Sequence, residues 1–174
     1  MATNWSEFRA AEPVFARIVE ERFLGHRHHV LATLRKDGSP RLTGLEVTFR
    51  SGELWLGMMQ GSRKAGDLRR DSRFALHANP GGGTGMDGGD VRVAGRAAEV
   101  TDPATVARFS REVGQPEPFH LFRAGLAEVV RVSVEGDELV VQAWRPGRAV
   151  RTVRRGSDDA VPREEGLGEP AGRT

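Results

Sequence analysis

The chain opens with apolar residues at helical spacing. They recur three and four positions apart between residues 5 and 23: Phe8, Ala11, Phe15, Ile18, Val19 and Phe23. This spacing predicts one amphipathic helix over residues 5–23, which Asn4 or Ser6 can cap and which Gly25 ends.

From residue 29 the pattern changes to short β-rich segments separated by turn sequences. Residues 29–35, 41–49 and 54–58 predict an antiparallel meander, 73–78 and 90–100 two further strands, and 127–134 with 138–144 a final hairpin. Helices are expected from Ser62, a good N-cap, to residue 70 and from residue 101 to about residue 113. Many short strands joined by hairpins predict a mainly β fold, a barrel or a sandwich with flanking helices.

Two segments lack any packing pattern. The glycine-rich stretch 79–89 is expected to be a mobile loop, a flap over a bound cofactor. Residues 154–174 lose apolar residues and gain Gly, Pro and charge, so we expect a disordered tail. With 174 residues the chain has room for one compact domain, which we expect to span residues 1–153.

Composition excludes several functions. The absence of cysteine removes disulfides, thiol catalysis and cysteine-ligated metal centres. The 26 basic residues nearly cancel the 24 acidic ones and are interleaved with them, which argues against nucleic-acid binding. No apolar run approaches the ~18 residues of a membrane span, and residues 1–23 lack the regions of a signal peptide. We therefore expect a soluble, cytoplasmic protein.

The candidate chemistry begins where the third predicted strand meets a helix. Ser62, Arg63 and Lys64 stand at this junction. A helix N-terminus presents unpaired N–H groups and a partial positive charge, and a guanidinium and an ammonium beside it favour binding of a phosphate. The alternative is a capped surface helix with two solvated cations.

Three segments together resemble a known family. They are residues 30–40, residues 61–65 with 67–73, and residues 90–97. Their order and spacing are similar to those of the pyridoxamine 5′-phosphate oxidase-like proteins, flavin-binding split barrels with deazaflavin-dependent relatives. The resemblance covers residues 28–145. It implies an antiparallel split β-barrel with flanking helices, a homodimer with a cofactor at its interface, and an FMN-dependent oxidoreductase acting on a small molecule.

The resemblance also implies which residues hold the cofactor. Arg63 and Lys64 are expected to bind its phosphate, with Ser62 supporting them. The other expected contacts are Arg41, Leu42, Thr43, Gly44, Leu45, Glu46, Gly57, Met58, Asp90 and Trp144. For Arg41 a solvated strand position is the alternative, and for Trp144 a place in the core. No catalytic residue is implied.

The sequence departs from the pyridoxal-forming members at two points. Those enzymes carry a lysine near the position of Glu46 and an Arg-x-His motif before the last strand, and this chain has neither. A substrate other than pyridoxamine phosphate is therefore expected. Use of the deazaflavin coenzyme F420 in place of FMN is one alternative, and a haem or flavin binding protein without turnover is another.

The histidines offer a weaker set of candidates. Related split barrels bind haem through a histidine, so His77 and His120 are possible axial ligands. His26, His28 and His29 cluster where the first helix meets the first strand. We interpret them as a solvated strand edge rather than a metal site.

Overall fold

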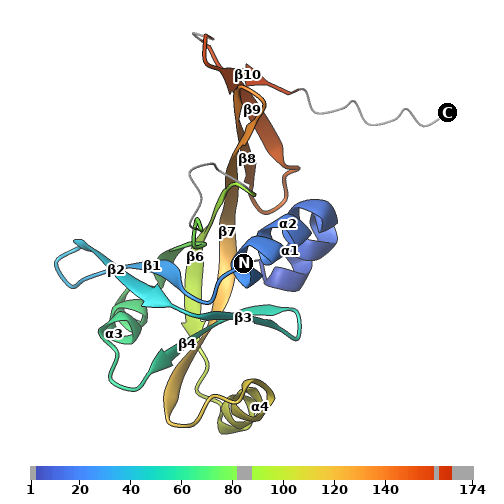
Figure 1. Cartoon of the computed structure of the whole chain (residues 1–174). Coiled ribbons are helices and arrows are strands. Elements are labelled where there is room, and N and C mark those ends of the chain that lie inside the picture. Colours follow the sequence, from blue (N-terminus) through green and yellow to red (C-terminus); the bar gives the residue numbers. More distant parts are fainter. Residues whose placement is uncertain (1–2, 82–87, 159–160, 166–174) are drawn as a thin grey trace.

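The structure, a computed structural model, describes residues 3–81, 88–158 and 161–165 (Figure 1). The helices are α1 (Trp5–Ala11), α2 (Pro13–Leu24), α3 (Arg63–Arg70) and α4 (Pro103–Val113). The strands are β1 (His29–Leu34), β2 (Pro40–Leu45), β3 (Val47–Arg50), β4 (Glu53–Met59), β5 (Arg73–His77), β6 (Asp90–Glu99), β7 (Phe119–Glu135), β8 (Glu138–Trp144), β9 (Arg151–Gly156) and β10 (Arg163–Glu164).

The strands form an antiparallel sheet that curls on itself. Its order is β10-β9-β8-β7-β6-β5-β1-β2, and β4 leaves this path to pair with both β7 and β3. The path ends at β2, and the branch through β4 ends at β3. Only Glu46 separates β2 from β3, so these two ends of the curled sheet are consecutive in the chain. The result is the expected mainly β split barrel with flanking helices, from which β8, β9 and β10 extend away (Figure 1).

The N-terminal helices cover the barrel and complete its core. Phe8 packs against Trp144 with ring centroids 4.5 Å apart, and Trp5 packs against Phe49 at the same separation. Asn4 caps α1 through a capping box with Glu7, as its position before the first apolar residue predicts. Burial of these aromatic rings fixes the helices on the sheet.

A smaller apolar cluster attaches α4 to the other end of the barrel. Phe109 of α4 packs on Trp55 of β4 and on Phe119 of β7, with ring centroids 5.6 Å and 5.9 Å apart. Asp102 caps this helix by accepting a hydrogen bond from the Thr105 N–H, which confirms the predicted start. The cluster fixes the loop that follows α4 beside β4.

Three predicted elements have different bounds in the structure. The single helix over 5–23 is wrong, because Pro13 disfavours a helical conformation at Glu12 and separates α1 from α2. The strand over 41–49 is two strands, since β2 pairs with β1 and β3 with β4. The strand over 127–134 begins already at Phe119, where β7 pairs with β4.

The C-terminal region also differs from its prediction. β9 extends to Gly156, and Arg163–Glu164 pair with it as β10, so the expected disorder is wrong for these residues. The remainder of the predicted tail lies partly outside the described residues, as do positions 82–87 of the glycine-rich segment. Among the described helices, none has the length and apolar character needed to cross a membrane.

Candidate functional site

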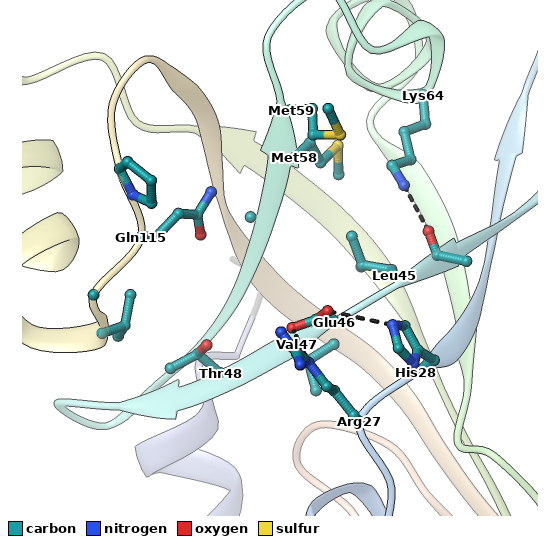
Figure 2. Close-up of a pocket in the computed structure, with 15 residues that line it drawn as sticks. Arg27, His28, Leu45, Glu46, Val47, Thr48, Met58, Met59, Lys64 and Gln115 are labelled. Atoms are coloured by element: carbon teal, nitrogen blue, oxygen red, sulfur yellow. Dashed lines mark hydrogen bonds and ion pairs between the residues drawn. The ribbon is translucent and has the colours of Figure 1, made fainter.

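A cavity of about 480 Å³ opens between the β2–β3 stretch, β4, the start of α3 and the loop after α4 (Figure 2). Pockets for small ligands and cofactors have volumes of roughly 300–1,000 Å³. The cavity therefore has room for a ring system. We refer to it as the β2–β4 pocket.

The strands supply the apolar part of the β2–β4 pocket. Leu45 at the end of β2 is 4% exposed, and Met58 on β4 is 2% exposed. Val47 adds a half-buried side chain from β3. The side chain of the next residue, Met59, points to the opposite face of β4. It is 83% exposed at the rim of the pocket. These side chains offer an apolar surface on which a flat ring can pack.

Lys64 supplies a cation where α3 begins. Its Nζ donates a hydrogen bond to the Gly44 carbonyl oxygen at 2.6 Å, which directs the ammonium across the pocket toward β2 (Figure 2). Burial lowers the pKa of Lys64 from its ordinary value. An ammonium has three donors, so two remain for a ligand. Gly44 leaves open space beside it, since a Cβ there would meet nothing within 4 Å.

The loop after α4 forms the facing wall. Gln115 directs its side-chain amide into the pocket toward β4 (Figure 2). It lies against Gly57, where an added Cβ would come within 2.8 Å of the Gln115 Oε1 atom. Thr48 of β3 contributes a hydroxyl nearby. The pocket thus has polar groups at two separated points and apolar side chains between them.

A charged cluster lies at the rim. The Glu46 carboxylate accepts a contact from Arg27 Nε at 3.0 Å and one from His28 Nε2 at 3.3 Å (Figure 2). Half of the Glu46 side chain is exposed, so these solvated contacts have small energy. They direct the carboxylate toward residues that precede β1, which compensates its negative charge beside the pocket.

A second group of charges lies between the β1–β2 turn and α3. Asp67 is 3% exposed and accepts hydrogen bonds from Arg41 Nε at 2.6 Å, Thr33 Oγ1 at 2.9 Å and Arg70 Nη2 at 3.0 Å. Burial opposes ionisation of this carboxyl group, but the three donors outweigh it and lower the pKa of Asp67 to about 2. The depression around it is also lined by Arg35, Lys36 and Asp37.

Comparison with known families decides the affiliation of the chain. The family model described as pyridoxamine 5′-phosphate oxidase matches residues 17–139, more than half of the sequence. The chain belongs to this family. Among curated proteins no significant match is found.

Solved structures agree with this affiliation at the level of the fold. General stress protein 26 from Bacillus anthracis superimposes with a TM-score of 0.51 at 15% identity, covering 74% of this chain and 96% of that one. A haem binding protein from Mycobacterium smegmatis superimposes with a TM-score of 0.54 at 17% identity, covering 74% of this chain and 57% of that one. ChuZ from Campylobacter jejuni superimposes with a TM-score of 0.56 at 12% identity, covering 76% of this chain and 60% of that one. The present chain therefore spans less than two thirds of the Mycobacterium smegmatis and Campylobacter jejuni proteins.

The structure brings about half of the family-implied contacts into the β2–β4 pocket. These are Gly44, Leu45, Glu46, Gly57, Met58 and Lys64. They come from three separate elements, so their convergence is a property of the fold and not of sequence proximity. Their contact with a cofactor stays a prediction.

The other implied residues lie outside the β2–β4 pocket. Arg41 pairs with Asp67, Leu42 is 70% exposed on the outer face of β2, and the buried Thr43 Oγ1 has no partner in the described residues.

At the helix start and beyond, three implied contacts also lie elsewhere. Ser62 precedes α3 but makes no side-chain capping bond, and Arg63 is exposed beside it. Asp90 begins β6 opposite Val132. Trp144, 1% exposed against Phe8, belongs to the core of this chain.

The histidines are used mainly as structural groups. His29 is buried against Phe23, accepts a hydrogen bond from the Asn79 N–H, and burial lowers its pKa. His120 accepts from the Gly61 N–H through Nε2 and lies 3.3 Å from Glu99 through Nδ1, so both ring nitrogens are engaged. Within the described ranges no group of three or more His, Asp or Glu side chains could hold a metal ion.

The structure adds pocket residues that the sequence did not indicate. They are Arg27, His28, Val47, Thr48, Met59, Val113, Gly114, Gln115 and Pro116. The residues from 113 to 116 reach the pocket only because α4 packs on β4. The Gly-Gln-Pro sequence at the end of a predicted helix was the one local signal of an ordered loop there.

Proposed function

We propose that this protein is an FMN-dependent oxidoreductase that acts on a small organic molecule. One observation carries the proposal: Lys64 lies at the start of α3 beside a cavity of about 480 Å³ with an apolar wall. A cation at a helix start suits a phosphate, and the apolar wall suits a flat ring. Membership of the pyridoxamine 5′-phosphate oxidase family supports the same assignment.

The residues present fit such a cofactor. Lys64 would bind the phosphate, Arg63 is exposed on the same turn, and Gly44 leaves space beside β2. Leu45 and Met58 would exclude water from one side of the ring. FMN supplies hydride and electron transfer when bound, and the protein binds and orients it. Glu46 in place of a lysine favours a substrate other than pyridoxamine phosphate.

The proposal is tested by cofactor retention. The purified protein is incubated with FMN, desalted, and its absorbance spectrum recorded. We expect a retained flavin band near about 450 nm, a property of the cofactor itself. The Arg63→Ala/Lys64→Ala variant should lose this band while its circular dichroism is unchanged. Lys36→Ala is the matched control, because Lys36 is the other lysine and lies on the exposed β1–β2 turn.

Two outcomes would contradict the proposal. Retention of coenzyme F420 but not FMN would assign the same site to the deazaflavin-dependent relatives. An unchanged flavin content in the Arg63→Ala/Lys64→Ala variant would leave both side chains as solvated cations. If FMN is retained, reduction of the bound flavin by candidate substrates then separates an enzyme from a flavin carrier.

Haem binding is the second candidate. The fold is shared with the haem binding protein from Mycobacterium smegmatis, and His77 supplies the observation in this chain. Its Nδ1 lies 2.6 Å from the Ala78 carbonyl oxygen, so this nitrogen donates and Nε2 is the nitrogen left to bind a metal. In the described part of the chain Nε2 has no partner. A Soret band after incubation with haemin, lost in His77→Ala, would favour this function.

A homodimer is the assembly that we propose for either function. β2 is the last strand of the sheet, and its outer face carries Leu42, 70% exposed, beside Val30 of β1, 43% exposed. An apolar face on an edge strand is a surface that a second copy can cover. Because Gly44 and Leu45 follow on the same strand, that copy would lie beside the β2–β4 pocket.

A further inference from the structure

The Gln115 side chain occupies a space that exists only because residue 57 is a glycine. A Cβ at position 57 would lie 2.8 Å from Gln115 Oε1 and 3.5 Å from Cδ and Nε2. Cβ atoms in folded proteins essentially never approach another atom this closely, so any larger residue at position 57 would displace the amide. The chain therefore places the amide of Gln115 directly on the strand backbone.

The backbone of Gln115 is held in place from both sides. Gly114 ends α4 in the left-handed conformation with φ of 70°, and its N–H donates to the Ser110 carbonyl. The Ser110 hydroxyl donates to the Gln115 carbonyl oxygen at 2.7 Å. Pro116 then restricts Gln115 to extended backbone conformations. The backbone that carries the amide is therefore already ordered before a ligand binds.

The amide has unused hydrogen-bonding capacity. Within the described residues, no protein group donates to its oxygen or accepts from its nitrogen. It faces the pocket from the side opposite Lys64, with Met58 and Leu45 between them (Figure 2). A ligand bound to Lys64 through a phosphate would extend its ring past the apolar side chains toward Gln115.

We infer that Gln115 is the specificity-determining residue of the β2–β4 pocket and binds a ring edge of the imide type, in which an N–H lies between two carbonyl groups. A carboxamide presents one acceptor and two donors side by side, and this arrangement pairs with an imide N–H and its neighbouring carbonyl. FMN carries such an edge at N3, whereas a porphyrin has none. The inference rests on the proposed function, since it assigns a role toward the same flavin.

The test compares FMN with FMN methylated at N3. N3-methylation removes the donor that Gln115 would recognise and leaves the phosphate and the ring unchanged. Dissociation constants are measured by quenching of flavin fluorescence. The wild-type protein should bind the methylated flavin about tenfold more weakly, the usual effect of losing one such hydrogen bond. Gln115→Ala should bind FMN about tenfold more weakly and no longer distinguish the two flavins.

The variants at position 57 separate contact from general disturbance. Gly57→Ala should weaken FMN binding in the wild-type background because it displaces the amide. In the Gln115→Ala background the same change should have little further effect. Gln60→Ala is the matched control for Gln115→Ala and should bind FMN as the wild-type protein does, since Gln60 is exposed just beyond β4 and does not line the pocket.

The outcomes distinguish this inference from the proposed function. Failure of the wild-type protein to bind FMN overturns both. Binding of FMN with equal affinity for the N3-methyl derivative overturns only the role of Gln115, and this comparison needs no variant that must fold. Retained discrimination in a Gln115→Ala variant with native circular dichroism also overturns it.

Discussion

Asp67 is a buried carboxylate that holds side chains from three elements. Arg41 comes from β2, Thr33 from β1 and Arg70 from the end of α3. Because Asp67 is 3% exposed, its charge would be costly without these donors. The arrangement fixes α3, and with it Lys64, against the first two strands.

The pH dependence follows from the pKa of Asp67, lowered from 3.8 to about 2. A carboxyl group with a lowered pKa in the folded state stabilises the protein fully above its unfolded pKa. That contribution is lost as the pH falls from about 4 to about 2. Asp67→Asn should reduce the free energy of unfolding by about 2–3 kcal/mol at pH 7, and the difference from wild type should shrink below pH 4. Urea unfolding at several pH values measures this.

Asp71→Asn is the matched control for this prediction. The pKa of Asp71 is also lowered to about 2, chiefly by a hydrogen bond from Arg73, but Arg73 is 61% exposed. An exposed pair of this kind contributes little to stability. An equal loss of stability in both variants would show that burial of Asp67 has no special effect.

At the scale of elements, local hairpins could be predicted and long-range pairing could not. β8 was expected at its observed bounds because Glu138–Trp144 pairs with the preceding residues across a short turn. The first part of β7 was missed, because residues 119–123 pair with β4, 60 or more residues earlier in the chain. The break at Glu46 was missed for the same reason, since it depends on which strands β2 and β3 join.

The same distinction applies to the candidate site. Lys64 lies in a segment with a recognisable family pattern, and the resemblance implied Gly44 and Leu45 as further contacts, so their place beside one pocket could be expected. Gln115 carries no motif and becomes a pocket residue only through the packing of Phe109 on Trp55. The Gly-Gln-Pro sequence indicates an ordered loop at this position, but it does not indicate which strand the loop contacts.

Two glycines in regular elements should respond oppositely to alanine. Gly95 lies where the register of β6 and β7 shifts, and a Cβ there would come within 1.9 Å of the Gly125 carbonyl oxygen. Gly95→Ala should therefore lower the free energy of unfolding by at least about 3 kcal/mol or prevent folding. Gly66 is an exposed position of α3 with nothing within 4 Å of an added Cβ. Gly66→Ala should raise the free energy of unfolding by about 0.5–1 kcal/mol. Urea unfolding measures both changes. Stability changes of the same sign in the two variants would contradict the close approach of β7 to Gly95.

At the scale of the whole molecule, the outer face of β1 and β2 is left uncovered by the residues that the structure describes. Val30 stands opposite Gly44 and Ala32 opposite Leu42 in the β1–β2 register, so Val30 and Leu42 share this face. The core is filled from the other face of these strands by Leu31 and Leu45. A dimer formed through the outer face would therefore bury apolar surface without any rearrangement of the barrel.

A single charge on this face should dissociate the dimer. The wild-type protein is expected to have a molar mass of about twice 19.0 kDa by light scattering after size-exclusion chromatography. Leu42→Asp should have the mass of one chain, because a carboxylate buried without a partner is costly. It should also retain less FMN, since the second copy would lie beside Gly44 and Leu45. Leu24→Asp is the control, as Leu24 is 67% exposed at the end of α2. A dimer that survives Leu42→Asp, or one that Leu24→Asp disrupts equally, would move the interface away from β2.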